Sequence, residues 1–241
     1  MNWNPQPQSQ QPAWIDGRTA ESGLRERAFI RSVYAWMFGG LLLTALASFW
    51  VVSSPAMQNV LYGNRATMWI LMAAELGLVF YLSLRITKMS SGAAAGAFLV
   101  YSLLNGLTLS AIFFVYTQGS ILRAFVTAAA MFAVMSVYGT VTKRDLTSWG
   151  SFFMMGVFGL IICSLLNIFL KSSALDWTIS VIGVFVFLGL TAYDTQKLRA
   201  LAHAGTGTLR ENFAVIGALA LYLDFINLFL FLLRIFGGRR D

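Results

Sequence analysis

The chain has 241 residues, of which 58% are hydrophobic and 11% are charged, and its formal net charge at pH 7 is +7. A soluble globular domain carries about 25% charged residues, so this composition excludes an ordinary water-soluble protein. The mean hydropathy of +0.70 and the long apolar blocks described below indicate a protein that is embedded in a membrane.

The chain begins with a polar segment, MNWNPQPQSQQPAWIDGRTAESG (residues 1–23), which holds three of the four prolines. A segment of this composition cannot bury a core, and we predict that it is a disordered tail. It contains no short apolar region followed by a small-residue cleavage site, which a signal peptide would need. The first hydrophobic block is therefore expected to stay in the protein as helix 1.

Seven apolar blocks follow, at about residues 30–52, 66–86, 93–116, 120–141, 150–170, 176–196 and 213–235. The hydrocarbon core of a bilayer is about 30 Å thick, which an α-helix crosses with roughly 20 apolar residues. The blocks have this length and occupy most of the chain. We therefore predict an all-α membrane protein with a single seven-helix transmembrane domain over residues 24–241.

Local signals refine two of these helices. The segment TLRE (208–211) has the pattern of a capping box, so helix 7 is expected to begin near Thr208. Gly205 would then end an extended helix 6. Gly92 and Gly96 form a GxxxG pattern at the start of helix 3, which is typical of close packing between transmembrane helices.

The distribution of Lys and Arg predicts the orientation. With a cytoplasmic N-terminus, eleven of the 17 Lys and Arg residues fall on inside segments and six fall outside. Cytoplasmic loops carry the excess of such residues, so the net charge of +7 needs no nucleic-acid partner. Three of the six outside residues are Arg234, Arg239 and Arg240. An eighth or re-entrant segment would place them inside, and this alternative topology stays open.

Three acidic residues fall within the predicted spans, where ionisable groups are costly and mark functional sites. Glu75 lies in helix 2, Asp194 near the inner end of helix 6, and Asp224 in the middle of helix 7. An ionised carboxylate at the position of Asp224 costs at least about 2.5–3.5 kcal/mol. A purely structural interpretation is also open: Asp224 would be neutral and hydrogen-bonded, and Asp194 would pair with Lys197 at the membrane surface.

The segments TAYDTQKL (191–198) and ALYLDFINLFLFLLRIFG (220–237) resemble the signature of the Bax inhibitor-1 family, also known by the transmembrane Bax inhibitor motif. The resemblance extends to YSLLNGLTLSAIFFVYTQGSILRAF (101–125) and YGTVTKRDLTSWGSFF (138–153). It covers the chain from about residue 25 onward. The short loops and the polar tail look like the bacterial branch of the family.

This resemblance implies a seven-helix bundle with helix 7 at its centre, and a pH-sensitive calcium leak in the bacterial inner membrane. It implies that Asp194 and Asp224 form the gate and pH sensor, with Glu75 and Arg85 linked to them. When two carboxyl groups are held close together, keeping one shared proton costs less free energy than ionising both groups. Calcium prefers carboxylate oxygens, so the same pair would contact the passing calcium ions or protons, and no resident cofactor is expected.

Two other functions deserve comparison. Bacterial relatives are similar to modulators of a membrane-bound AAA protease that act through the N-terminal tail, so regulation of such a protease is the alternative function. An intramembrane aspartyl protease also uses two aspartates, the first after a tyrosine, as in Tyr193-Asp194. Its second motif is GxGD, whereas Leu221 and Leu223 precede Asp224. We therefore predict that the protein is not an enzyme.

Overall fold

A computed structural model of the chain describes residues 13–203 and 207–238, with side chains from residue 22 onward except for His203. The predictions for residues 1–12, Gly205, Arg239 and Arg240 therefore lie outside the described residues. The described chain is helical, with α1 (Ala13–Ser53), α2 (Pro55–Tyr62), α3 (Arg65–Arg85), the 3-10 turn η1 (Ile86–Lys88), α4 (Ser91–Leu109), α5 (Ile112–Val115), α6 (Gln118–Val141), α7 (Thr147–Leu170), α8 (Ser173–His203) and α9 (Thr208–Phe236).

Seven helical segments in the described chain are long and apolar enough to cross a membrane, which confirms the predicted number. They correspond to α1, α3, α4 with α5, α6, α7, α8 and α9. The last span begins at Thr208, as the sequence predicts, although Gly207 and not a threonine side chain stands at its N-cap. The preceding span, α8, is extended over 31 residues. The short helix α2, with Pro55 in its first turn and Ser54 as its cap, was not predicted.

The first helix is longer than predicted. Residues 13–23, which we assigned to a disordered tail, form the beginning of α1. The sequence AESGLRERA (20–28) is rich in residues with high helix propensity. Once a helix has formed, adding a residue to its end is far easier than starting a new helix. The apolar span therefore extends its helix into the polar segment.

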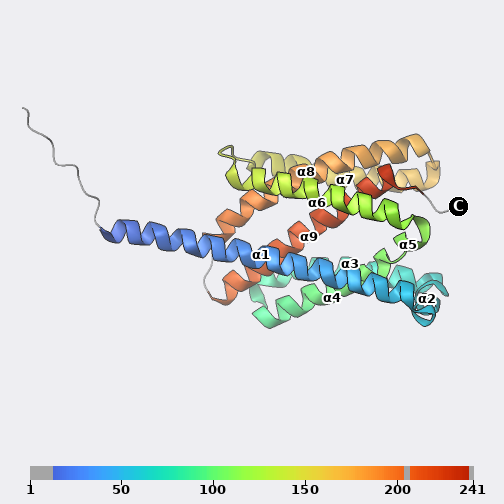
Figure 1. Ribbon diagram of the computed structural model, residues 1–241, viewed down its shortest axis with the longest axis horizontal. Coiled ribbons are helices and arrows are strands. Elements are labelled where there is room, and N and C mark those ends of the chain that lie inside the picture. The colour runs from blue at the N-terminus through green and yellow to red at the C-terminus, as the bar shows by residue number, and fades with distance from the viewer. Residues whose placement is uncertain (1–12, 204–206, 239–241) are drawn as a thin grey trace, which may run out of the picture.

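The helix α9 runs obliquely between α1, α3 and α4 on one side and α6, α7 and α8 on the other (Figure 1). It contacts α1, α4, α6 and α8. In its most apolar stretch 67% of the residues are buried, against 6% in α3 and in α7. The last helix therefore supplies much of the core, while α3 and α7 expose most of their side chains to the lipid.

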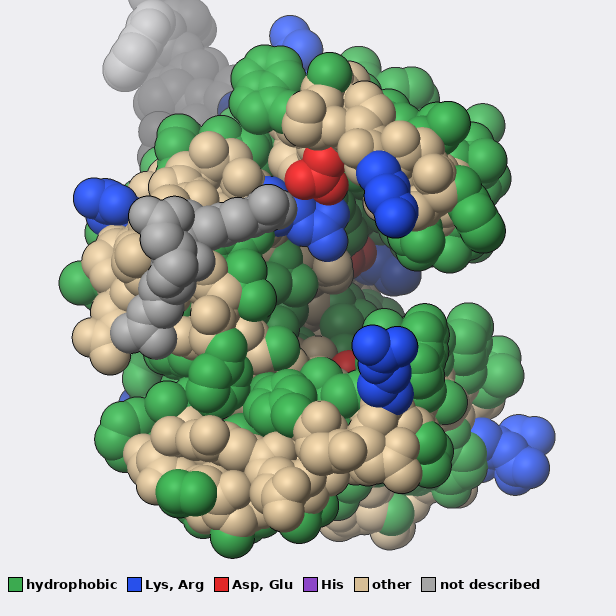
Figure 2. All heavy atoms as spheres, turned by 90° about the vertical axis from the view of Figure 1, so that its right-hand side faces the viewer, with side chains coloured by type: hydrophobic (Ala, Val, Ile, Leu, Met, Phe, Trp, Pro, Cys, Tyr) green, Lys and Arg blue, Asp and Glu red, His purple; other side chains and the backbone are tan. Residues whose placement is uncertain are grey.

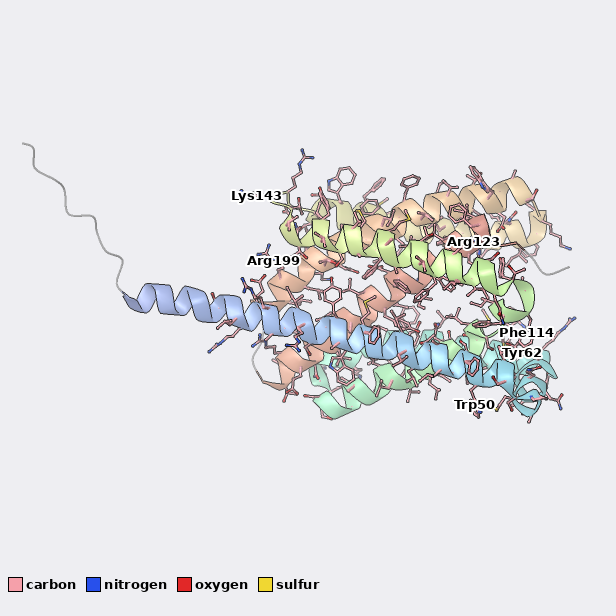
Figure 3. The ribbon with its side chains drawn as sticks, viewed as in Figure 1. Trp50, Tyr62, Phe114, Arg123, Lys143 and Arg199 are labelled. Atoms are coloured by element: carbon pink, nitrogen blue, oxygen red, sulfur yellow. The ribbon has the colours of Figure 1, made fainter. Side chains whose placement is uncertain are left out.

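The helix α1 begins and α9 ends at opposite ends of the bundle (Figure 1), as an odd number of spans requires. The turns after α3, α6 and α8 lie at the end where α1 begins, and we call this the basic end. Lys143 and Arg199 lie there, whereas Trp50, Tyr62 and Phe114 lie toward the opposite end (Figure 3). The described Lys and Arg residues of the basic end are Arg25, Arg27, Arg31, Arg85, Lys88, Lys143, Arg144, Lys197, Arg199 and Arg210. The cytoplasmic location of this end stays a prediction of the charge distribution.

Close backbone contacts occur at glycines other than the predicted pair. A Cβ atom on Gly92 or Gly96 would meet nothing within 4 Å, so the GxxxG prediction was wrong. A Cβ on Gly106 would instead lie 2.5 Å from a backbone oxygen of α1. A Cβ on Gly139 would lie 2.3 Å from a backbone oxygen of α8. These two glycines let α4 approach α1, and α6 approach α8, more closely than any larger residue allows.

Candidate functional site

Asp194 and Asp224, one on each of the last two helices, lie near each other in the bundle. Asp224 lies in the middle of α9 and is 4% exposed, and Asp194 lies in α8 and is half-buried. Their carboxyl groups are close enough to interact electrostatically. Because α8 continues to His203, Asp194 stands well inside a helix rather than at its end. The length of α8 thus allows two residues that are 30 positions apart in sequence to form one site.

The Asp224 carboxyl group has an incomplete set of partners. Its Oδ2 atom is buried and has no hydrogen-bond partner in the described part of the chain. A buried acceptor without a donor costs about 1–3 kcal/mol, and more when it is charged. A proton shared with the neighbouring Asp194 carboxyl group, or a cation beside the pair, would reduce this cost. The site therefore has the chemistry to hold a proton or a hard cation.

Asp194 reaches the outside of the bundle. It lines a groove of about 370 Å³ between α7 and α8, together with Ser151, Met154 and Lys197. Lys197 interacts electrostatically with Asp194, and its ammonium nitrogen lies 5.8 Å from the centre of the Tyr193 ring. No ion pair joins Lys197 to Asp194 within the described structure. Asp194 thus interacts with the enclosed Asp224 and also lines a groove at the basic end.

The part of α8 around Asp194 is fixed by hydrogen bonds to the loop between α6 and α7. Gln196 accepts a bond from the backbone N–H of Leu146 through Oε1, over 2.8 Å. Its Nε2 donates to the backbone oxygen of Arg144, also over 2.8 Å. One side chain therefore satisfies two backbone groups of the loop and anchors it two residues beyond Asp194.

A second set of contacts ties α8 to α1 and α6. Arg199 forms an ion pair with Glu26 of α1, with 2.7 Å between Nε and Oε1. Its Nη1 donates to the backbone oxygen of Thr140 in α6 over 3.0 Å. One turn earlier, the hydroxyl of Thr195 donates to that of Ser136 over 3.4 Å. Three helices are thereby held together next to the acidic pair.

Glu75 belongs to a different polar cluster. Its Oε1 accepts a hydrogen bond from Thr108 over 2.7 Å, and its Oε2 accepts one from the Asn105 amide over 3.3 Å. The Oδ1 atom of Asn105 accepts a bond from the Tyr222 hydroxyl over 3.0 Å. Glu75 is thus linked to α9 only two residues before Asp224. This chain of bonds joins α3, α4 and α9.

The sequence analysis missed Asn105 and Tyr222. Asn105 is the single Asn or Gln in the span Ser91–Val115, and a buried amide needs polar partners. That signal could have marked it as the neighbour of an intramembrane acid. Tyr222 gives no comparable signal, because tyrosines are common in membrane helices. Its role depends on contacts between helices that are far apart in the sequence.

Arg85 lies apart from these groups. It is exposed at the last residue of α3, ten positions after Glu75, which corresponds to about 15 Å along a helix. Within the described residues it makes no ion pair with Glu75, Asp194 or Asp224. The role that the family resemblance implies for Arg85 stays a prediction.

Calcium takes six to eight oxygen ligands, and the described residues contain no group of three or more His, Cys, Asp and Glu side chains. The carboxyl groups of Asp194 and Asp224 can supply part of such a shell, with water or backbone oxygens for the rest.

Comparison with known proteins adds to this geometry. Residues 26–241 match the model of the family described as "Inhibitor of apoptosis-promoting Bax1". The chain is 49% identical over 218 residues to the inner membrane protein YbhL of Escherichia coli K12, and the aligned region covers 89% of this chain and 93% of that protein. It is 46% identical over 216 residues to an uncharacterized protein of Deinococcus radiodurans, covering 89% and 92% of the two chains. A protein of Caulobacter vibrioides is 37% identical over 241 residues, covering 95% of each chain.

Proposed function

We propose that this chain, which belongs to the Bax inhibitor-1 family, is a pH-sensitive calcium leak of the bacterial inner membrane. In this proposal Asp194 and Asp224 form the gate. The observation that carries it is the buried Oδ2 atom of Asp224, which has no hydrogen-bond partner among the described residues while a second carboxyl group interacts with Asp224. The similarity to an inner membrane protein of E. coli supports the proposed location.

The gate would respond to pH through one shared proton. With that proton in place, the pair carries at most one negative charge, and the donor that Asp224 lacks is supplied. Loss of the proton leaves two like charges close together in a medium of low dielectric constant, and their repulsion favours separation of α8 and α9. A cation between the carboxylates then becomes favourable. The leak is therefore expected to rise with pH.

The groove beside Asp194 supports the same function. It gives the half-buried carboxyl group of Asp194 a route to the basic end, while Asp224 is enclosed. The link from Tyr222 through Asn105 to Glu75 would transmit a displacement of α9 to α3. In this proposal Glu75 adjusts the gate without contacting the ion.

Calcium influx into proteoliposomes at about pH 6, 7 and 8 tests the gate, because a gate that is closed by one shared proton must open as rising pH removes that proton. We expect the wild-type flux to rise with pH, and Asp194→Asn or Asp224→Asn to flatten that rise. Asp176→Asn is the matched control, because Asp176 lies at the other end of α8. If all four proteins match empty liposomes, or share one flux at every pH, the gate hypothesis is lost.

A second candidate function is regulation of a membrane-bound protease. The observation that favours it is the first part of α1, which extends beyond the other helices at the basic end (Figure 1). Such a projecting helix would be available to the part of a membrane-bound partner that lies outside the bilayer. Deletion of residues 1–23 separates the two functions, because a leak should survive the deletion and a protease modulator should lose its effect.

A further inference from the structure

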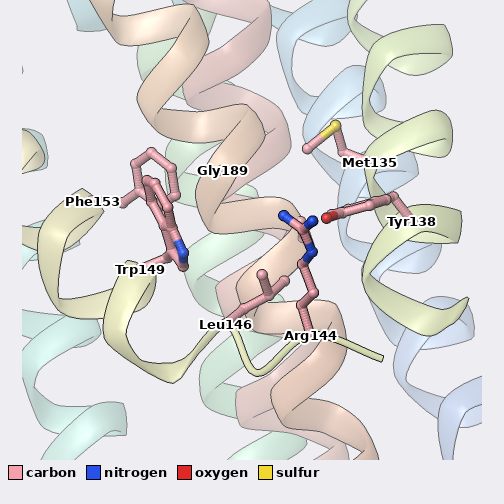
Figure 4. A pocket seen from close by; sticks show the side chains of 8 residues that line it. Met135, Tyr138, Arg144, Leu146, Trp149, Phe153 and Gly189 are labelled. Carbon is pink, nitrogen blue, oxygen red and sulfur yellow. The ribbon is translucent and has the colours of Figure 1, made fainter. Parts of the chain in front are cut away.

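A pocket of about 200 Å³ lies between α6, α7 and α8 at the basic end (Figure 4). Its polar lining residues are Tyr138, at the end of α6, and Arg144, in the loop that follows. The apolar wall includes Met135, Leu146, Trp149 and Phe153. The pocket thus combines a mostly apolar wall with one cationic group.

The positive charge of Arg144 faces this pocket, and Arg144 forms no ion pair with an acidic residue in the part of the chain that the structure describes. The guanidinium group reaches toward the Tyr138 hydroxyl (Figure 4), and none of the lining residues is acidic. The neighbouring Asp145 carboxylate accepts hydrogen bonds from the hydroxyl and the backbone N–H of Thr147, over 2.6 and 2.9 Å. These bonds hold the pKa of Asp145 below its usual value and keep its charge at the start of α7.

The pocket lies where a helix bundle meets lipid head groups. Tyr138 is 41% exposed and Trp149 is 56% exposed, and both stand at the end of a span. Tyrosine and tryptophan at such positions mark the interface between the hydrocarbon core and water. A lipid of the leaflet at the basic end would therefore have its head group near Arg144 and its tail along the apolar wall. Figure 2 shows the molecule from the opposite end, where lysine and arginine side chains are scattered among apolar ones.

We propose that this pocket binds one anionic phospholipid of that leaflet. The planar guanidinium of Arg144 can form two parallel hydrogen bonds to a phosphate, and the Tyr138 hydroxyl can donate a third. Basic pockets between transmembrane helices are known to accept anionic lipid head groups in this way. A zwitterionic lipid adds an ammonium group, which the guanidinium repels. The proposal does not depend on the calcium leak.

A phospholipid bound in the pocket would also restrain the part of α8 around Asp194. Gln196 joins the backbone of the Arg144 loop to α8 two residues beyond Asp194. A phosphate on Arg144 would therefore restrain the loop from the lipid side while Gln196 restrains it from α8. Binding should raise the thermal stability of the full-length protein, which gives a second readout.

Native mass spectrometry of the full-length protein, with phosphatidylglycerol and phosphatidylcholine present in equal amounts, tests the proposal. We expect the wild type to retain phosphatidylglycerol preferentially, and Arg144→Gln to lower that preference roughly tenfold, as the loss of a charge-assisted contact would. Lys143→Gln is the matched control, because it removes the same charge from the same loop at a residue that does not line the pocket. Met135→Trp should also lower retention, since it fills the pocket while keeping the charge.

A cooperative unfolding transition in detergent without added lipid shows that each variant is folded. Equal losses of phosphatidylglycerol in Arg144→Gln and Lys143→Gln would overturn the proposal, because they would indicate a general attraction to the basic end. Unchanged retention in Arg144→Gln would overturn it as well. Displacement of the lipid by glycerol 3-phosphate at equal concentration would identify a site for small free anions instead of a lipid site.

Discussion

Tyr222 on α9 donates a hydrogen bond to the Oδ1 atom of Asn105 on α4, with 3.0 Å between the two oxygens. The direction is fixed, because the Asn105 amide nitrogen faces the Glu75 carboxyl group and its oxygen must therefore face Tyr222. The Tyr222 hydroxyl has one proton, so it can only accept from Thr44, which lies 2.6 Å away. Thr44 must then share its proton between Tyr222 and the backbone oxygen of Ser102. Glu75 thereby orders the hydroxyl groups of α1 and α9.

The first prediction concerns this network. Tyr222→Phe removes the donor to Asn105 and leaves its Oδ1 atom buried, which costs about 1–3 kcal/mol. The ring contacts of Tyr222 with Phe98 and Tyr101, both 5.8 Å between centroids, would be kept. We therefore expect a lower unfolding temperature in detergent, measured by tryptophan fluorescence.

The matched control is Tyr101→Phe. Its ring is buried beside Tyr222, and its hydroxyl makes no hydrogen bond to the described residues. It should unfold close to the wild-type temperature. If the two variants lose the same stability, the hydrogen bond to Asn105 contributes nothing specific.

The second prediction concerns the ion pair between Arg199 and Glu26, which ties α8 to α1. Arg199 is 47% exposed and Glu26 is 20% exposed, so water and salt screen the pair. A double-mutant cycle with Arg199→Gln and Glu26→Gln should give a coupling free energy of about 0.5–1 kcal/mol. The coupling should shrink at high salt. Strictly additive effects at low salt would show that the pair does not stabilise the bundle.

The third prediction compares two glycines of α4. A methyl group on Gly106 would lie 2.5 Å from the backbone oxygen of Thr44, so α4 and α1 would have to separate. Gly106→Ala is expected to lower the free energy of unfolding by about 1–3 kcal/mol. Gly96→Ala meets nothing within 4 Å and should be neutral or stabilising by up to about 1 kcal/mol. Equal effects of the two substitutions would contradict the close contact at Gly106.

These glycines show where sequence reasoning succeeds and where it ends. The seven spans and the start of α9 at Thr208 follow from local length, hydropathy and helix-start signals. The GxxxG pattern at Gly92 and Gly96 is equally local, yet a Cβ atom on either glycine would meet no atom of the described residues within 4 Å. Which face of a membrane helix meets a neighbour depends on packing across the whole bundle, because lipid-facing and protein-facing residues are both apolar.

The candidate site also has a part that the sequence predicts and a part that it does not. Asp194, Asp224 and Glu75 stand out in the sequence because charged groups are rare within spans. The sequences of α8 and α9 do not determine how closely these helices approach each other. The sequence alone therefore does not show whether the two aspartates interact. The partners of Glu75 are likewise set by the approach of α4 to α9. The local sequence identifies a carboxyl group that is costly to bury in the membrane, and the tertiary fold determines which groups form hydrogen bonds with it.

The last prediction concerns the route by which ions reach Asp194. If the groove between α7 and α8 is that route, a bulky group attached inside it should block most of the calcium flux. Cys163 is the only cysteine, so a Cys163→Ser background allows one new thiol at a time. Ser151→Cys places that thiol in the groove, and Ser148→Cys places it on the same helix at an exposed residue that does not line the groove. Reaction with a membrane-impermeant thiol reagent should stop the leak in the first protein and spare it in the second. An unchanged flux in a fully labelled Ser151→Cys protein would mean that ions reach Asp194 from within the bundle.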